Sequence, residues 1–341
     1  DGRGLPIDGR GDPGAPEVRP VRGQRLGALE RAPHREPLVT GVRSLDAFVT
    51  CCVGQRLGIF AGGGVGKSVL LGMIARSSTA DVNVLALVGE RGREVGDFLH
   101  HELGADGLAR SVVVVATSDE PPVQRVQAAR VACAVAESFR DRGQRVLLLL
   151  DSLTRVAMAQ REIGLGAGEP PTTRGYPPSS FALLPELIER AGVARGGSIT
   201  GFYTILLEGD DIDAPVSDAA RAVLDGHIVL SRELAMANHF PAVDVLESIS
   251  RLRDDCQDPE MNAACRSLIE VFAARHAMDD LISIGAYKSG SDRRVDRALA
   301  IQEQMSLFLK QDRREASGWD VTRAELLRLA NLVQEPSVVP A

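Results

Sequence analysis

The stretch that decides the fold is "GIFAGGGVGKSVLL", residues 58–71. An apolar run ending at Ala61 leads into a glycine-rich turn, then a lysine and a serine, then a second apolar run. Between a strand and a helix, this pattern predicts a phosphate-binding P-loop. The glycines let backbone N–H groups turn toward phosphate oxygens, and the following helix points its positive end at the same anion.

The P-loop assigns roles to individual side chains. Lys67 is expected to reach the β- and γ-phosphates of a nucleotide, and Ser68 to offer its hydroxyl to Mg²⁺. Only three of the 39 basic residues are lysines. A lysine at this position is therefore weak added evidence that the site requires lysine rather than arginine. The residues expected to contact the nucleotide here are Gly62, Gly63, Gly64, Val65, Gly66, Lys67, Ser68 and Val69.

Outward from the loop, short apolar runs alternate with helical stretches. Because these runs are continuously apolar, both faces of the strands should be covered, which predicts a mostly parallel sheet in an α/β fold. The expected strands are residues 56–61, 82–89, 111–117, 145–151, 198–209 and 226–232. Helical patterns take over after about Asp254, and a capping-box spacing from Thr322 to Glu325 suggests where the last helix begins.

A second carboxylate is expected to help hold the Mg²⁺ ion. "RVLLLLDSLTR", residues 145–155, ends its apolar run at Asp151. An aspartate after a buried strand is common, but together with the P-loop it predicts a group that holds the water shell of the metal.

The stretch "LALVGERGREVGDF", residues 85–98, brings charges to the end of another buried strand. Hydrolysis of a γ-phosphate needs a group that orients and deprotonates water, and ligands lie at the carboxyl ends of such strands. Glu90 is therefore the candidate base, with Glu94 sharing the water network and Arg91 and Arg93 compensating the carboxylates. A solvated loop of alternating charges is the alternative explanation.

Composition excludes several classes of protein. The 341 residues are 44% hydrophobic and 25% charged with a net charge of −7, which is typical of a globular protein and does not favour a nucleic-acid partner. No apolar run approaches the roughly 20 residues needed to span a bilayer, and no signal peptide is evident. The five cysteines form no CxxC pair, so we expect buried, reduced thiols in a cytoplasmic protein.

Longer motifs together resemble one family, the ATPase of flagellar and virulence-type type III secretion export systems, which is related to the catalytic subunit of rotary ATP synthases. The resemblance runs from about Pro37 to Val333. The motifs that carry it are "AGGGVGKS", "GERGREV", "LLLLDSLTR", "RGYPPSSFALLPELIERAG", "SITGFYTILLEGDDIDAPVSDAARAVLDGHIVLSR" and "HFPAVDVLESISR".

This resemblance implies a RecA-like P-loop core with an all-helical C-terminal domain, Mg²⁺-ATP as substrate, and a homohexamer. It divides the chain into residues 1–37, a linker after an N-terminal β-barrel, residues 38–253, the ATPase domain, and residues 254–341, the helical domain. It gives Glu90 the role of catalytic carboxylate, with Arg91 and Glu94 in its network.

Two further roles follow from the resemblance alone. Phe240 matches the aromatic residue that packs against adenine, and Arg251 matches an arginine donated to the site of a neighbouring subunit. Arg313 stands where synthase relatives place a second aromatic residue under adenine, so that contact is not transferred.

The function implied is hydrolysis of ATP that helps release and unfold export substrates or their chaperone complexes. The implied partners are the export apparatus, a stalk or regulator protein, and the cytoplasmic face of the inner membrane, where the protein is peripheral; no nucleic acid is expected. Two alternatives stay open. One is a non-catalytic nucleotide-binding subunit of a rotary-type ATPase, which Glu90 disfavours, and the other is a RecA-like nucleic-acid motor, which the acidic balance disfavours.

Overall fold

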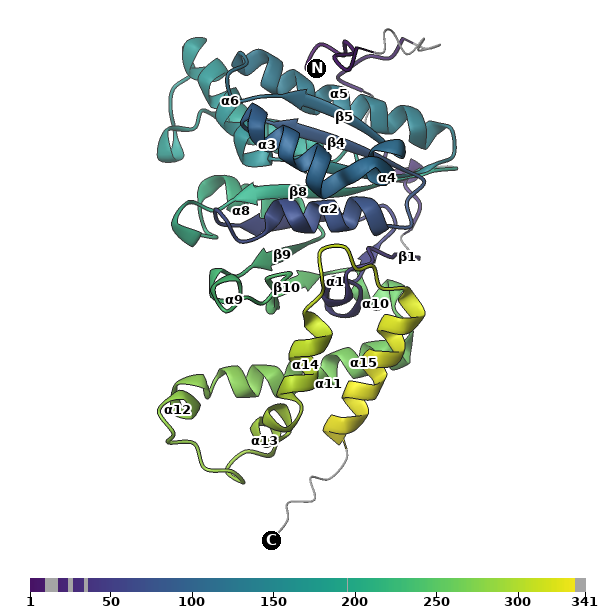
Figure 1. Ribbon diagram of the computed structural model, residues 1–341. Helices are drawn as coiled ribbons and strands as arrows, with labels where there is room; N and C mark the ends of the chain where they lie inside the picture. The colour runs from purple at the N-terminus through teal and green to yellow at the C-terminus, as the bar shows by residue number, and fades with distance from the viewer. Residues whose placement is uncertain (10–17, 24–26, 34–35, 195, 335–341) are drawn as a thin grey trace.

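A central sheet of eight strands organises the computed structural model, which describes residues 1–9, 18–23, 27–33, 36–194 and 196–334 (Figure 1). The strand order is β10-β9-β3-β8-β6-β4-β5, and the six strands from β9 to β5 are parallel, which confirms the predicted α/β fold. These six are β3 (Arg56–Ala61), β4 (Val82–Val88), β5 (Ser111–Ala116), β6 (Arg145–Asp151), β8 (Ser198–Leu206) and β9 (Gly226–Leu230).

Successive side chains of each inner strand enter opposite cores, because side chains in a strand alternate between its two faces. Leu85 and Leu87 of β4 belong to one core cluster, and Val84 and Ala86 belong to the other. The first face is covered by α2 (Lys67–Ser77), α3 (Gly92–Asp97), the π-helical η2 (Phe98–Leu103) and α4 (Gly104–Ala109). The second is covered by α5 (Pro122–Asp141), α6 (Leu153–Gly166), α7 (Pro178–Ile188) and α8 (Pro215–Val223).

Two strands run against the parallel direction. The edge strand β10 (Val243–Ser250) pairs antiparallel with β9, and the short β7 (Gly192–Val193) pairs antiparallel with the start of β8. A separate small sheet joins β1 (Pro37–Leu38) to β2 (Cys51–Cys52). Short helices complete this part of the chain: η1 (Ala28–Glu30), α1 (Arg43–Phe48), η3 (Thr173–Gly175), η4 (Glu208–Asp210) and α9 (Arg232–Met236).

After β10 the described chain is helical, and these helices gather beyond the β10 edge of the sheet (Figure 1). Their buried Leu268, Leu326 and Leu329 belong to the same hydrophobic core as α1 and α2, so this core is continuous with that of the sheet. The helices are α10 (Arg253–Cys256), α11 (Pro259–His276), α12 (Asp279–Ser283), α13 (Arg293–Ala300), α14 (Gln302–Leu309) and α15 (Trp319–Gln334).

Two local predictions were wrong. Thr322 does not cap the last helix, because α15 begins at Trp319 and the Thr322 hydroxyl is buried 2.9 Å from the Ser317 hydroxyl. Cys52 and Cys256 form a disulfide, whereas Cys51, Cys133 and Cys265 are free and buried as expected. The bonded pair is 204 residues apart in sequence, and only the packing of α10 against β2 brings it together.

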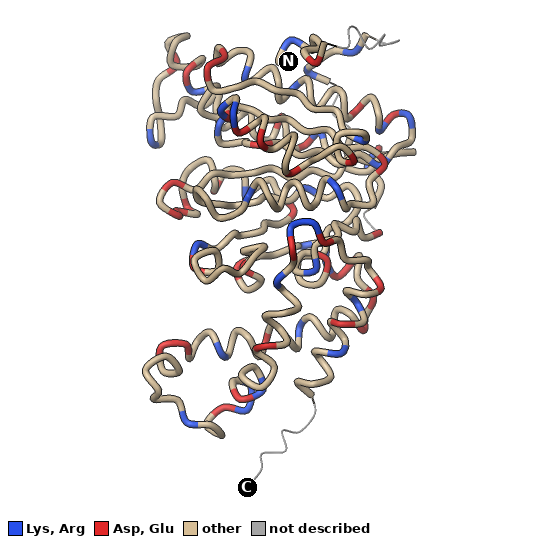
Figure 2. The backbone as a smooth tube through the Cα atoms, in the orientation of Figure 1, with Lys and Arg blue, Asp and Glu red and all other residues tan. Residues whose placement is uncertain are grey.

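Charges of both signs are interspersed along the described chain (Figure 2). Among the described residues, no helix is both long and apolar enough to cross a membrane. Part of the predicted linker, namely residues 10–17, 24–26 and 34–35, lies outside the described residues, as do residues 335–341 at the other end.

Candidate active site

The predicted P-loop connects β3 to α2 at the carboxyl edge of the sheet. Gly64 and Gly66 have φ of 77° and 94°, in the left-handed region that favours glycine, so the sequence can turn sharply here. Gly66 is also the N-cap of α2 and makes no side-chain cap, so the first N–H groups of this 11-residue helix remain available to an anion. The side chain of Val65, which is part of the loop, is buried and holds the loop backbone against the core.

Three charged side chains meet beside this loop. The Lys67 Nζ lies 2.5 Å from Asp151 Oδ1 and 3.3 Å from Glu90 Oε1. The side chains of Lys67 and Glu90 are each 13% exposed and that of Asp151 is 5% exposed, so the group is largely shielded from solvent. The sheet brings the carboxylates together because β4 and β6 are parallel neighbours, with Leu87 opposite Asp151 in register and Glu90 just beyond the end of β4.

A cavity of about 70 Å³ opens between these side chains. Ser68, Glu90, Glu94 and Asp151 line it together with apolar residues of β4, α3 and η2. This volume is enough for one or two water molecules. The site therefore offers carboxylates and a hydroxyl around a small, partly enclosed space next to the P-loop.

The two glutamates of this cavity have opposite pKa shifts. Burial raises the pKa of Glu90, Lys67 opposes that increase, and the charge of Asp151 and a hydrogen bond with Glu94 add to it. The pKa of Glu94 is lowered, mainly by the same hydrogen bond with Glu90. A carboxylate with a raised pKa is suited to take a proton near neutral pH.

Other predicted site residues lie outside this cluster. Arg91 is 82% exposed and pairs with Glu94 at 3.8 Å rather than with Glu90, and Arg93 pairs with Asp97 at 3.9 Å. Arg91 and Arg93 are thus exposed to solvent, and neither pairs with Glu90 among the described residues.

Phe240 lies beside the P-loop, next to Gly66. A Cβ atom added at Gly66 would lie 3.4 Å from the Phe240 ring, and a cavity of about 30 Å³ beside the ring is lined by Val69, Pro241 and Arg313 among others. The aromatic ring and Val69 therefore lie together beside the P-loop. Arg313 pairs with Glu102 at 3.8 Å.

Arg251 lies near the amino ends of the parallel strands, whereas the P-loop lies at their carboxyl ends. Ser250 pairs with Gly226 at the start of β9, whereas Ala61, just before the loop, pairs with Leu230 at its end. The five residues of β9 span about 13 Å, so Arg251 does not reach the P-loop of its own chain. Its side chain is exposed.

Two residues beside the carboxylates were not predicted. Arg155 Nε lies 3.6 Å from Glu90 Oε1, and the Thr204 hydroxyl donates to Asp151 Oδ1 at 2.7 Å. Arg155 stands in the quoted "DSLTR" stretch only four residues after Asp151, and this closeness in sequence is a usable signal. Thr204 lies within an apolar run, and only the order of strands in the sheet reveals its contact.

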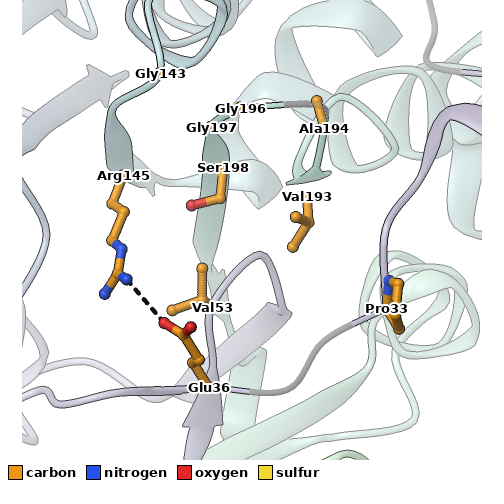
Figure 3. Close-up of a pocket in the computed structure, with 10 residues that line it drawn as sticks. All are labelled: Pro33, Glu36, Val53, Gly143, Arg145, Val193, Ala194, Gly196, Gly197 and Ser198. Atoms are coloured by element: carbon orange, nitrogen blue, oxygen red, sulfur yellow. Dashed lines mark hydrogen bonds and ion pairs between the residues drawn. The ribbon is translucent and has the colours of Figure 1, made fainter.

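A different cavity, of about 410 Å³, opens near the amino ends of β6 and β8, where Arg145 pairs with Glu36 at 2.8 Å (Figure 3). None of the predicted site residues is among the described residues that line it.

In the described part of the chain, no group of three His, Cys, Asp or Glu side chains is placed to hold a metal ion. A Mg²⁺ ion bound with a nucleotide keeps several waters and takes few protein ligands; Ser68 would offer its hydroxyl, and Asp151 would hold the water shell of the ion.

Comparison with known proteins identifies the family. The nucleotide-binding domain of the ATP synthase alpha/beta family matches residues 41–250, and the T3SS EscN ATPase C-terminal domain matches residues 257–328. The chain is 52% identical to the flagellum-specific ATP synthase of Treponema pallidum, over 98% of this chain and 76% of that protein. It is 49% identical to the type 3 secretion system ATPase of Xanthomonas euvesicatoria, over 94% of this chain and 73% of that protein.

Solved structures agree with these relatives. The assembled ATPase EscN of the enteropathogenic E. coli type III secretion system superposes with a TM-score of 0.92 at 44% identity, covering 97% of this chain and 80% of EscN. The chain therefore belongs to the ATP synthase alpha/beta family, among the flagellum-specific ATP synthases and type 3 secretion system ATPases.

Proposed function

We propose that this chain hydrolyses Mg²⁺-ATP to energise protein export through a flagellar or type III secretion apparatus. The observation that carries the proposal is the small cavity in which Ser68, Glu90 and Asp151 meet beside Lys67. A site that only held nucleotide would need the loop and the lysine, but it would have no use for a buried carboxylate of raised pKa.

Each side chain has a separate task in this proposal. The N–H groups of the P-loop and the Lys67 ammonium bind the triphosphate. Ser68 would offer its hydroxyl to Mg²⁺ and Asp151 would hold the water shell of the ion, which would neutralise charge on the phosphates. Glu90 orients a water molecule and accepts its proton as the water oxygen bonds to the γ-phosphorus; the bond to the β-γ bridging oxygen breaks, and ADP leaves with the electron pair.

A residue that contacts adenine and a residue from the neighbouring subunit complete the site. Phe240 packs against adenine. Arg251 acts in the site of an adjacent copy, because its edge of the sheet lies opposite the P-loop. Arg155, near Glu90, balances part of the carboxylate charge when Lys67 turns to the phosphates.

The proposed assembly is a homohexamer that works with a stalk protein. The E. coli relative has been solved both as an assembled ATPase and in a complex with its central stalk EscO. We propose the same kind of stalk partner here, together with export substrates, their chaperones and a peripheral position at the cytoplasmic face of the inner membrane. We also retain the division into an ATPase domain, residues 38–253, and a helical domain, residues 254–341.

Glu90→Gln tests the chemistry. The amide keeps the size and reach of the side chain but cannot accept the proton, so the full-length protein should bind a fluorescent ATP analogue with unchanged affinity and release phosphate at least about 100-fold more slowly. The matched control is Glu162→Gln, since Glu162 is an exposed partner of Arg125 on α6. Phosphate release near the wild-type rate in Glu90→Gln would contradict the assignment.

A further inference from the structure

Thr204 approaches the proposed metal site from β8, the strand between β3 and β6. Its side chain is fully buried, and its hydroxyl lies 2.7 Å from Asp151 Oδ1. We infer that Thr204 is a positioning residue that fixes the Asp151 carboxylate for Mg²⁺-nucleotide binding. This inference rests on the proposed function and adds a residue to it.

The direction of the hydrogen bond is determined by the acceptors around the hydroxyl. Thr204 has one proton to donate, and its two acceptors are Asp151 Oδ1 at 2.7 Å and the Leu150 carbonyl at 3.4 Å. The shorter distance is typical of an O–H donor and an oxygen acceptor, and a bond to a carboxylate is about twice as strong as a neutral one. The proton therefore points to Asp151.

Lys67 and Thr204 share one oxygen of Asp151. The ammonium and the hydroxyl both donate to Oδ1, and no described residue donates to Oδ2. Asp151 also lines the cavity that Ser68 shares. Two donors on one oxygen fix the rotation of the carboxylate and leave the other oxygen available to a metal-bound water.

The two donors differ in what happens when a triphosphate enters the loop. The Lys67 ammonium then has phosphate oxygens as partners. The Thr204 hydroxyl has no comparable alternative, because its other acceptor is the distant Leu150 carbonyl. Thr204 thus remains on Asp151 when Mg²⁺ arrives.

The backbone of Thr204 is held on both sides. Thr204 is in register with Ile59 of β3, and the preceding Tyr203 is in register with Leu150 of β6. Because two neighbouring strands hold the backbone of Thr204, its hydroxyl keeps the Asp151 carboxylate in one orientation when the P-loop moves. Groups of this outer kind typically change metal affinity 10- to 100-fold when removed.

Thr204→Val removes the hydroxyl with little change of shape, and Thr204→Ser keeps it. The matched control is Thr200→Val, because Thr200 is buried on the same strand and its hydroxyl accepts from the Gly54 N–H at 2.8 Å, away from the site. Each full-length variant is titrated with a fluorescent ATP analogue in Mg²⁺ and in EDTA, and the Mg²⁺ concentration for half-maximal phosphate release is measured.

Thr204→Val should raise that Mg²⁺ concentration about tenfold and weaken analogue binding in Mg²⁺ but not in EDTA. Thr204→Ser should stay within about twofold of wild type, and Thr200→Val should lower thermal stability without changing the Mg²⁺ dependence. If Thr204→Val does not fold, Thr204→Ala carries the same test, since it also lacks the hydroxyl and needs less room.

The inference is overturned if loss of the hydroxyl leaves the Mg²⁺ dependence unchanged, weakens binding equally in Mg²⁺ and EDTA, or acts as Thr200→Val does. It is also overturned if Thr204→Ser matches Thr204→Val. Failure of the proposed function has a different signature, because the wild-type protein itself would then release no phosphate from Mg²⁺-ATP.

Discussion

Lys67 is the counter-ion of two carboxylates in the structure, and it has to exchange them for phosphates when ATP binds. Its charge lowers the pKa of Glu90 against the larger effect of burial. As the ammonium turns to the phosphates, that opposing effect weakens and the pKa of Glu90 rises further. In the proposed mechanism, entry of the substrate thus makes Glu90 a stronger base toward the attacking water, which links binding to hydrolysis through one lysine.

The raised pKa of Glu90 predicts a pH dependence. Glu90 must be ionised to accept a proton, so kcat/KM should fall as the pH drops through the pKa of Glu90, which is raised from its ordinary value. The hydrogen bond with Glu94 contributes to that increase. Glu94→Gln removes the carboxylate from that bond, so the acid limb should move to lower pH.

The measurement is kcat/KM for ATP from about pH 5 to pH 9, since this ratio reports the free enzyme. Asp97→Asn on the same helix is the control, because Asp97 is 60% exposed and pairs only weakly with Arg93. An acid limb that stays in place in Glu94→Gln means that Glu94 does not tune the base.

At the scale of elements, the loop between α14 and α15 joins the helical region to the nucleotide site. Gln311 is buried in this loop, and its side chain accepts from the Arg43 N–H and donates to the Gly41 carbonyl at 2.7 Å. Its own N–H donates to the Phe240 carbonyl at 2.9 Å. The backbone at the predicted adenine contact is therefore bonded to a residue in the loop between two C-terminal helices.

Gln311→Ala should lower the free energy of unfolding by about 1 to 2 kcal/mol, because it removes the side-chain hydrogen bond to the Gly41 carbonyl and leaves the part-buried Arg43 N–H without an acceptor. Urea unfolding followed by circular dichroism measures the loss. Gln304→Ala on the exposed side of α14 is the control and should change stability by less than about 0.5 kcal/mol. Equal stability of the two variants would show that Gln311 does not connect the regions.

The sequence predicts some elements better than others, for physical reasons. The six parallel strands are continuous apolar runs, and burial on both faces makes such runs easy to recognise. The edge strand β10 reads "VDVLESIS", where polar residues interrupt the run because one side of the strand is less covered. Contacts such as Thr204 with Asp151 depend on which strands are neighbours, and no local pattern specifies that order.

For the whole molecule, the position of Arg251 predicts complementation between inactive variants. Arg251→Ala should bind ATP and hydrolyse it poorly, since an arginine that stabilises the transferred phosphoryl group in trans contributes roughly 10³–10⁵-fold in rate. An Arg251→Ala subunit still has Glu90, and a Glu90→Gln subunit still has Arg251. Mixing the two full-length variants should therefore restore activity in proportion to the mixed interfaces.

Mass measurement of the mixed assemblies provides the control, because it shows that subunits have exchanged. Mixed assemblies that remain as inactive as either pure variant would exclude a trans role for Arg251. Activity in pure Arg251→Ala close to that of wild type would exclude any role in hydrolysis.

In the proposed mechanism, the placement of Arg251 and the P-loop at opposite ends of the parallel strands makes hydrolysis depend on assembly. A contact between the Arg251 surface of one subunit and the P-loop surface of the next is head-to-tail. Such contacts either close into rings or continue as open chains. An open chain always carries one orphan P-loop at one end and one orphan arginine at the other. Ring closure joins those two ends and completes the one site that an open chain leaves incomplete, whereas a single copy has no complete site and in the proposed mechanism hydrolyses little ATP.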